Sequence, residues 1–200
     1  MKEAVNILIV GVGGQGVLLA SEVLSETAMK HGLDVKKSEV HGMSQRGGVV
    51  TSHVRIAETV YSPLIQEGTA DYLIAFEISE GLRALDWLKS GGTVISSMTR
   101  MVPPITTIGD YEYPMDPAGK IREIIPDAKI LDADKIAADL GNVRLVNTIL
   151  LGVLSTTLSI PEETWLEVIT KRVPKKFIDA NLEAFKKGRE YNFKPVAVGE

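Results

Sequence analysis

Short hydrophobic runs alternate along the chain with segments whose apolar residues recur at helical spacing. The runs predict strands at 5–10, 33–40, 49–56, 71–76, 93–97 and 129–132. The helical segments fall at 15–30, 80–89, 117–125, 133–140, 144–158, from 161 onward and at 174–190. Strands that alternate with helices favour parallel pairing through right-handed crossovers. The pattern therefore predicts an α/β fold, Rossmann-like and doubly wound, whose mostly parallel sheet carries helices on both faces.

No repeat, low-complexity tract or linker interrupts this pattern, so one domain over residues 1–200 is expected. The segment 101–113 carries Pro103 and Pro104 among β-branched residues, which indicates a ribbon or an edge strand. In the strand at 49–56, His53 and Arg55 share one face. That face is either an exposed sheet surface or the wall of a site.

The first strand runs into a glycine-rich turn, G-V-G-G-Q-G at residues 11–16, and then into a helix. In this context bare glycine backbone lets a phosphate approach, and the helix N-terminus offers free N–H groups. The alternative is a tight turn that only lets the helix pack on the sheet, and the amide of Gln15 could either contact a ligand or cap its own turn. The candidate binding residues here are Gly11, Gly13, Gly14, Gln15 and Gly16.

A second polar segment stands where a dinucleotide-binding protein would carry an acidic residue for the ribose, about 20 residues after the turn. It begins with Lys36 and Lys37 and leads into H-G-M-S-Q-R-G-G at residues 41–48. Polar side chains between glycines favour a ligand or interface role over a solvated loop. A guanidinium at residue 46 could hold a phosphate or carboxylate through two hydrogen bonds, or pair with an acid across an interface. The candidates are His41, Ser44, Gln45 and Arg46.

One further candidate is Glu77, which follows the strand at 71–76. The carboxyl ends of parallel strands are where open α/β sheets bind ligands, although a solvated carboxylate is an equal alternative. Asn147, on an otherwise apolar helix, is interpreted first as a buried hydrogen-bonding residue and second as a ligand contact.

Composition excludes several classes of protein. A net charge of -4 argues against nucleic-acid binding, and the absence of cysteine excludes disulfides, thiolate catalysis and a cysteine-bound iron–sulfur cluster on this chain. The three histidines have no ligand spacing, so no metal site is expected. No apolar run reaches membrane-spanning length and no signal peptide is evident, which predicts a cytoplasmic chain without a membrane partner.

The glycine turn, the H-G-M-S-Q-R-G-G segment with its following S-H-V-R strand, and Phe76-Glu77 together resemble one family. It is the gamma subunit, or gamma domain, of 2-oxoacid:ferredoxin oxidoreductases. The sequence of residues 41–48 is most similar to that of the beta subunits of indolepyruvate ferredoxin oxidoreductases. The resemblance covers nearly the whole chain in element order, with the specific motifs within residues 7–77.

The resemblance implies a subunit of a complex that oxidatively decarboxylates a 2-oxoacid, such as an aryl pyruvate, to an acyl-CoA. Thiamine diphosphate and iron–sulfur clusters would lie on a catalytic partner subunit, and ferredoxin would accept electrons through the complex. This chain would bind no cofactor firmly, could contact coenzyme A, and would be inactive alone, where it could form a homo-oligomer. Two alternatives stay open: a free-standing NAD(P)- or flavin-binding oxidoreductase in which Lys36 and Lys37 read a 2′-phosphate, and a purely structural interaction subunit.

Overall fold

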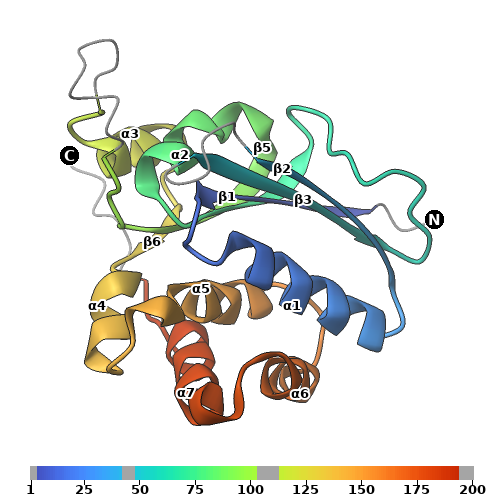
Figure 1. The fold of residues 1–200 in the computed structure, drawn as a ribbon. Helices are drawn as coiled ribbons and strands as arrows, with labels where there is room; N and C mark the ends of the chain where they lie inside the picture. Colours follow the sequence, from blue (N-terminus) through green and yellow to red (C-terminus); the bar gives the residue numbers. More distant parts are fainter. Residues whose placement is uncertain (1–3, 42–47, 103–112, 194–200) are drawn as a thin grey trace.

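The computed structural model describes residues 4–41, 48–102 and 113–193, and within them six strands form one sheet (Figure 1). The order is β2-β3-β1-β4-β5-β6. Neighbouring strands among β1, β4, β5 and β6 pair in parallel, whereas β3 runs antiparallel between β1 and β2. The mostly parallel sheet that the sequence predicts is therefore confirmed. The strand bounds are β1 Val5–Val12, β2 Asp34–His41, β3 Val49–Ala57, β4 Ala70–Ala75, β5 Leu88–Ser97 and β6 Lys129–Leu131.

Helices cover both faces of the sheet, as the alternating pattern predicts (Figure 1). One face carries α1 Val17–Lys30, α4 Ala133–Asp139, α5 Val146–Ser155, α6 Glu162–Arg172 and α7 Ile178–Arg189. The other face carries α2 Ile78–Arg83 and α3 Pro117–Ile124. Three short 3-10 turns complete the described elements: η1 Leu85–Trp87, η3 Val143–Leu145 and η4 Lys175–Phe177.

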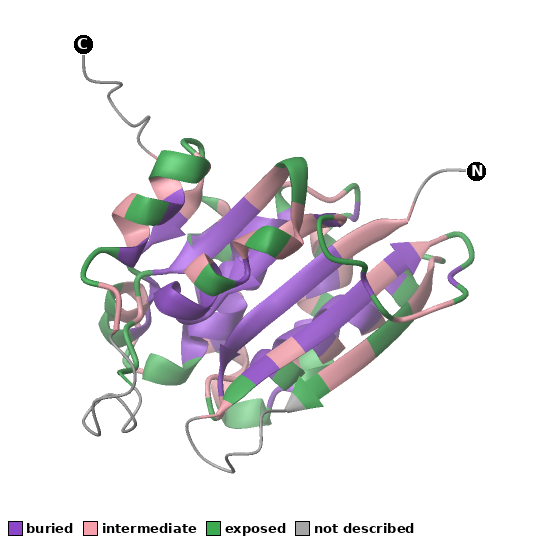
Figure 2. Cartoon of the chain, turned by 90° about the horizontal axis from the view of Figure 1, so that it is seen from above, coloured by how far each residue is buried: buried purple, intermediate pink, exposed green. Residues whose placement is uncertain are grey.

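The core has two layers because successive side chains of a strand point to opposite faces. Ile7 and Ile9 of β1 face the large cluster under α1 and α5, which includes the fully buried Trp165. Leu8 and Val10 face the smaller cluster under α2 and α3. Buried residues accordingly run along the inner strands in Figure 2.

Helix α5 is buried along its whole length, as its mostly apolar sequence predicts. Its contact with α7 depends on two glycines. A Cβ on Gly152 would lie 2.2 Å from the carbonyl oxygen of Phe185, and one on Gly188 would lie 2.0 Å from that of Ile149. Any larger side chain at either position would push the two helices apart.

The predicted helix at 80–89 is wrong in its second half. Helix α2 ends at Arg83, and Leu88 already belongs to β5, where it pairs with Ala70 of β4. Trp87, just before it, packs edge-on against the His53 ring with the centroids 5.2 Å apart. Pairing and packing with distant residues thus outweigh the local helical preference. The predicted ribbon at 101–113 lies largely outside the described residues.

Candidate functional site

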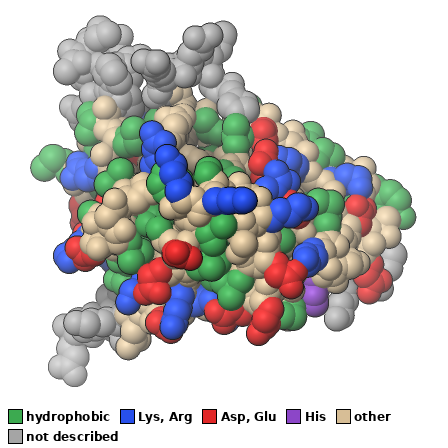
Figure 3. Space-filling view, turned by 60° about the horizontal axis from the view of Figure 1, so that its bottom comes forward, with side chains coloured by type: hydrophobic (Ala, Val, Ile, Leu, Met, Phe, Trp, Pro, Cys, Tyr) green, Lys and Arg blue, Asp and Glu red, His purple; other side chains and the backbone are tan. Residues whose placement is uncertain are grey.

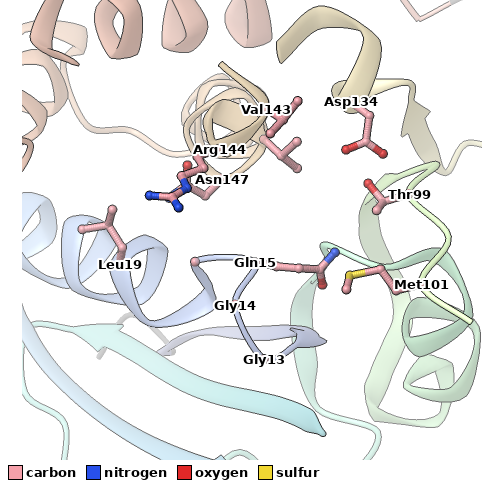
Figure 4. A pocket seen from close by; sticks show the side chains of 12 residues that line it. Gly13, Gly14, Gln15, Leu19, Thr99, Met101, Asp134, Val143, Arg144 and Asn147 are labelled. Carbon is pink, nitrogen blue, oxygen red and sulfur yellow. The ribbon is translucent and has the colours of Figure 1, made fainter. Parts of the chain in front are cut away.

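A cleft of about 480 Å³ opens at the carboxyl ends of the parallel strands (Figure 4). Its floor is the glycine turn between β1 and α1. Arg144 and Leu19 lie on one side in this view, and Asp134, Thr99 and Met101 lie on the other. The carboxyl edge of a parallel sheet is where open α/β folds bind ligands, so this cleft is the candidate site.

The backbone of the turn requires glycine at two positions. Gly14 and Gly16 adopt left-handed φ angles of 98° and 85°. Gly16 is also the N-cap of α1, and no side chain caps that helix. The first N–H groups of α1 therefore have no helical acceptor and can bind an anion in the cleft.

Packing constrains the same turn. A Cβ on Gly11 would lie 2.9 Å from Oε1 of Gln15, and one on Gly16 would lie 2.9 Å from Nδ2 of Asn147. Asn147 is buried, and its Oδ1 accepts the N–H of Thr148 at 2.8 Å. Its interpretation as a buried hydrogen-bonding residue is therefore confirmed, and its side chain also lines the cleft.

Two of the predicted binding residues use their hydrogen-bonding groups inside the protein. Gln15 accepts the N–H of Val12 at 2.7 Å and donates its amide Nε2 to the carbonyl of Phe76 at 3.0 Å. Gly13 donates its N–H to the carbonyl of Gly48 at 2.9 Å. The side-chain amide of Gln15 thus fixes the turn to the end of β4, which is the capping alternative. Ligand contact by the glycine backbone remains a prediction.

The contact between Gly13 and Gly48 brings the end of the second polar segment beside the glycine turn. His41 ends β2 opposite Val50 of β3, at the same edge of the sheet. Ser44, Gln45 and Arg46 lie outside the described residues, so their roles stay predictions.

Two charged residues of the cleft are not among the predicted site residues. Arg144 is exposed and Asp134 is half-buried, and no hydrogen bond or ion pair joins either side chain to another described residue. The N–H of Arg144 donates to Oδ1 of Asn142 at 3.1 Å, which fixes the backbone of η3 beside the cleft. Both residues lie far from the glycine turn in sequence, and only the sheet order brings them to it. The cleft therefore contains both the N-terminus of α1 and a guanidinium that no other described residue neutralises.

Glu77 does not line this cleft, contrary to its prediction as a ligand-contacting or solvated residue. It is 1% exposed and caps α2, accepting the N–H of Glu80 at 2.8 Å. Its other oxygen accepts the N–H of Met101 at 3.2 Å and the hydroxyl of Tyr113. A carboxylate at a strand end can be buried because three donors replace its water.

His53 and Arg55 do not line the candidate cleft, and His53 is buried, so their strand face is not an exposed sheet surface. Nδ1 of His53 accepts the N–H of Ile65 at 3.2 Å, and burial lowers the pKa of this imidazole. Arg55 donates to Oδ1 of Asn6 at 2.9 Å and to the carbonyl of Ser62 at 3.1 Å. Both side chains hold the segment 58–69 against the sheet.

Lys36 and Lys37 are not placed to read a nucleotide phosphate. Each pairs with an acid of its own strand, Asp34 at 2.7 Å and Glu39 at 2.8 Å. Antiparallel β3 also separates β2 from β1, the strand that leads into the glycine turn. A dinucleotide fold would instead place such residues on the neighbouring parallel strand. The geometry gives the free-standing dinucleotide alternative no support.

Other classes of site find no basis in the described part of the chain. No three of its His, Asp and Glu side chains are grouped as metal ligands. No helix in the described part of the chain is both long and apolar enough to span a bilayer. Basic and acidic side chains are interspersed over the helical face (Figure 3), where Lys171 and Arg172 of α6 both pair with Glu26 of α1.

A family model described as pyruvate ferredoxin/flavodoxin oxidoreductase matches residues 6–191. The chain belongs to this family. The indolepyruvate oxidoreductase subunit IorB of Thermococcus kodakarensis is 44% identical over 194 residues, which cover 94% of this chain and 95% of that protein. The resemblance of the sequence to this family is thus confirmed over almost its full length.

Solved structures of the family share the fold. The gamma subunit of a keto/oxoacid ferredoxin oxidoreductase from Geobacter sulfurreducens aligns with a TM-score of 0.67 at 23% identity, covering 93% of this chain and 96% of that one. The 2-oxoglutarate:ferredoxin oxidoreductase from Magnetococcus marinus, with 2-oxoglutarate, coenzyme A and succinyl-CoA bound, aligns with a TM-score of 0.71 at 25% identity. The match covers 94% of this chain but 31% of that larger chain.

Proposed function

We propose that the chain is the subunit without thiamine in a ferredoxin-dependent 2-oxoacid oxidoreductase, and that indolepyruvate or a related aryl pyruvate is the substrate. The support is the family membership together with the near full-length similarity to an indolepyruvate oxidoreductase subunit. In the overall reaction the 2-oxoacid loses carbon dioxide, its acyl group forms a thioester with coenzyme A, and two electrons pass to ferredoxin. The chain acts as a single gamma-type domain within a cytoplasmic complex.

Within that complex the redox chemistry belongs to the partner. Thiamine diphosphate and the iron–sulfur clusters lie on the catalytic subunit, since this chain contains no cysteine to bind a cluster. Ferredoxin exchanges electrons with that subunit rather than with this chain. The contribution of this chain is to bind and position the group that receives the acyl unit.

The observation that carries this assignment is Arg144, which has no side-chain partner among the described residues and lines the same cleft as the N-terminus of α1. Coenzyme A carries a pyrophosphate and a 3′-phosphate, and both a helix N-terminus and a guanidinium bind such groups. The oxoglutarate enzyme similar to this chain holds coenzyme A. The glycine turn and Arg144 would bind coenzyme A phosphates, while the thiol end reaches the active centre of the partner.

The edge of the sheet around the cleft also has the composition of a subunit interface. Val40, Val102 and Val143 are 54%, 56% and 68% exposed there. Apolar side chains exposed at one edge of a sheet are available for contact with another protein. Further exposed apolar residues at this edge are Leu18, Val49, Met98 and Met101. This edge would dock on the catalytic subunit, so that the cleft opens towards the thiamine site.

The polar segment at 41–48 is proposed for the same site on the basis of its sequence. The carbonyl of Gly48 accepts the N–H of Gly13, so the segment ends beside the glycine turn. Its candidates His41, Ser44, Gln45 and Arg46 would contact coenzyme A or the partner subunit. Arg46→Lys should raise the KM for coenzyme A about tenfold if this guanidinium forms two hydrogen bonds with a phosphate. A change in subunit affinity alone would assign Arg46 to the interface.

The test uses the complex reconstituted from this chain and its co-expressed catalytic subunit, assayed as coenzyme A-dependent reduction of ferredoxin by indolepyruvate. Arg144→Gln should raise the KM for coenzyme A about tenfold, the loss of one charge-assisted hydrogen bond. The matched control is Lys135→Gln, which removes an equal charge from α4, where Lys135 pairs with Asp139 outside the cleft. The isolated chain should show no turnover.

Three results would contradict parts of this proposal. Turnover by the chain alone would overturn the division of labour. If Arg144→Gln, Lys135→Gln and the wild type have the same KM for coenzyme A, the cleft does not bind coenzyme A. The chain would then be a purely structural subunit. A complex that oxidises other 2-oxoacids but not indolepyruvate would overturn the substrate assignment.

A further inference from the structure

The tripeptide Phe76–Ile78, at the junction of β4 and α2, connects the glycine turn to the segment 99–101. On the glycine side, the carbonyl of Phe76 accepts Nε2 of Gln15 at 3.0 Å. On the other side, the N–H of Ile78 donates to the carbonyl of Thr99 at 3.0 Å. Thr99 and Met101 line the cleft opposite Arg144 (Figure 4). The junction therefore joins two parts of the chain that line the cleft.

Glu77 is the side chain at the centre of the junction. Its Oε1 accepts the N–H of Met101 at 3.2 Å and the hydroxyl of Tyr113, and its Oε2 accepts the N–H of Glu80 at 2.8 Å. At 1% exposure it has no water to replace these donors. One carboxylate thus joins the start of α2 to the cleft wall.

Among the described carboxylates, only Glu77 accepts a hydrogen bond from the segment 99–101 that lines the cleft. Glu80, the next acid of α2, pairs with Arg83 at 2.7 Å. The Tyr113 ring also packs against the Arg100 guanidinium, whose Cζ lies 4.8 Å from the ring centroid. Burial and the bond to Glu77 raise the pKa of Tyr113, so its hydroxyl stays a donor at neutral pH.

No other side chain satisfies all three donors. Glutamine offers one acceptor oxygen, so it leaves either the Glu80 N–H or the Met101 N–H facing an NH₂ group. Aspartate is a good N-cap and keeps the charge, but it is one methylene shorter and cannot reach both α2 and Met101. Length and acceptor number together therefore specify glutamate here.

We propose that Glu77 is a positioning residue for coenzyme A, which sets the distance between the segment 99–101 and the glycine turn without touching the ligand. The proposal rests on the function proposed above for the cleft. It predicts that a loosened wall weakens binding of coenzyme A and leaves binding of the 2-oxoacid unchanged.

The test compares Glu77→Asp and Tyr113→Phe in the reconstituted complex. Glu77→Asp keeps the cap of α2 and should raise the KM for coenzyme A about tenfold, with kcat at saturating coenzyme A and the KM for indolepyruvate near wild type. Tyr113→Phe removes one donor and should shift the same constant in the same direction by less. The structural control is Asp116→Ala, which removes the N-cap of α3, where Oδ1 accepts the N–H of Gly119 at 2.9 Å. It should lower stability and leave both KM values unchanged.

A Glu77→Asp complex that is less stable but keeps the wild-type KM for coenzyme A would overturn the inference and reduce Glu77 to a helix cap. An equal rise of both KM values in this variant would overturn it too, because a general loss of structure would then be the cause. Arg144→Gln, measured in parallel, distinguishes the two levels. If Arg144→Gln raises the KM for coenzyme A and Glu77→Asp does not, only the inference about Glu77 is wrong. If neither variant changes this KM, the proposed function is wrong as well.

Discussion

The two ends of the parallel strands differ in how their polar groups are used. At the amino end, Arg55 bonds to Asn6 and to the carbonyl of Ser62, and Asp71 accepts the N–H of Asn6 at 2.7 Å. At the carboxyl end, Arg144 and Asp134 have no side-chain partner among the described residues. Charges that a protein pairs internally serve its stability, whereas charges left unpaired around a cleft are available to a ligand.

Glu77 shows that position at the carboxyl end is not enough to make a residue a ligand contact. Although it follows β4 at that end, its carboxylate is buried and bonded to three donors. Whether a residue is available to a ligand therefore depends on its hydrogen bonds and not on its place along a strand. Variants of internally bonded residues should change stability, and variants of the residues in the cleft should change ligand binding.

The largest expected effect contrasts Gly16 with Gly32. Both have left-handed φ angles, 85° and 87°, but a Cβ on Gly16 would lie 2.9 Å from Nδ2 of Asn147, whereas one on Gly32 would meet open space. Gly32→Ala should lower the free energy of unfolding by the backbone strain, about 1–2 kcal/mol. Gly16→Ala should lower it further and should also raise the KM for coenzyme A. Urea unfolding and the complex assay measure the two effects.

Equal losses of stability for the two alanine variants would show that Asn147 gives way freely, and the close packing of the turn would then be unimportant. A changed KM for coenzyme A in Gly32→Ala would break the comparison, because Gly32 lies at the far end of α1 from the cleft.

A smaller effect concerns His53. Burial lowers the pKa of this histidine in the folded state, so its contribution to stability is complete above the unfolded pKa of about 6.5 and is lost as pH falls below that value towards the lower folded pKa. The free energy of unfolding should therefore fall between pH 7 and pH 5. His53→Gln keeps an acceptor for the N–H of Ile65 and should reduce this fall. His53→Phe leaves that N–H unpaired and should cost about 1–3 kcal/mol at every pH.

Urea unfolding at pH 5, 6, 7 and 8 measures both variants against the wild type. An identical pH dependence in His53→Gln would show that other groups cause it, since the variant cannot titrate.

The smallest effect belongs to the ion pairs on the helical face. Glu26 of α1 accepts from Lys171 and Arg172 of α6, and these two hydrogen bonds hold the pKa of Glu26 below its usual value. Because exposed ion pairs contribute little, Glu26→Gln should cost less than about 1 kcal/mol. The cost should shrink further in 0.5 M salt, where the Debye length is about 4 Å instead of the roughly 10 Å of 0.1 M salt. A loss as large as that of Gly16→Ala would mean that α6 depends on this contact.

Hydrophobic periodicity and glycine position predicted the sheet, the helices on both faces and the buried α5, because these depend on local pattern and on alternation along the chain. The antiparallel insertion of β3 was not predictable in the same way. Its Val49–Ala57 sequence fits either orientation, and the choice depends on pairing with β1. The same long-range pairing made Leu88 a strand residue instead of the end of a helix.

The site was predicted in part. The glycine turn lines the cleft, because a strand–turn–helix motif is local in sequence. Arg144 lies in η3 and Asp134 in the first turn of α4. Neither element carries a binding motif in its sequence, and both residues reach the cleft through the strand order alone. The buried state of Glu77 depends on Met101 and Tyr113, which come from a later segment, so the strand that precedes it gave no indication of it.

The central claim is that coenzyme A binds in the cleft at the carboxyl ends of the parallel strands, and equilibrium titration of the complex with coenzyme A tests it most directly. Isothermal calorimetry in the absence of 2-oxoacid would compare wild type, Arg144→Gln in the cleft, and Lys89→Gln, whose side chain pairs with Asp71 at the amino end. The expected result is a Kd about tenfold higher for Arg144→Gln and unchanged for Lys89→Gln. The same Kd for all three complexes would contradict the claim.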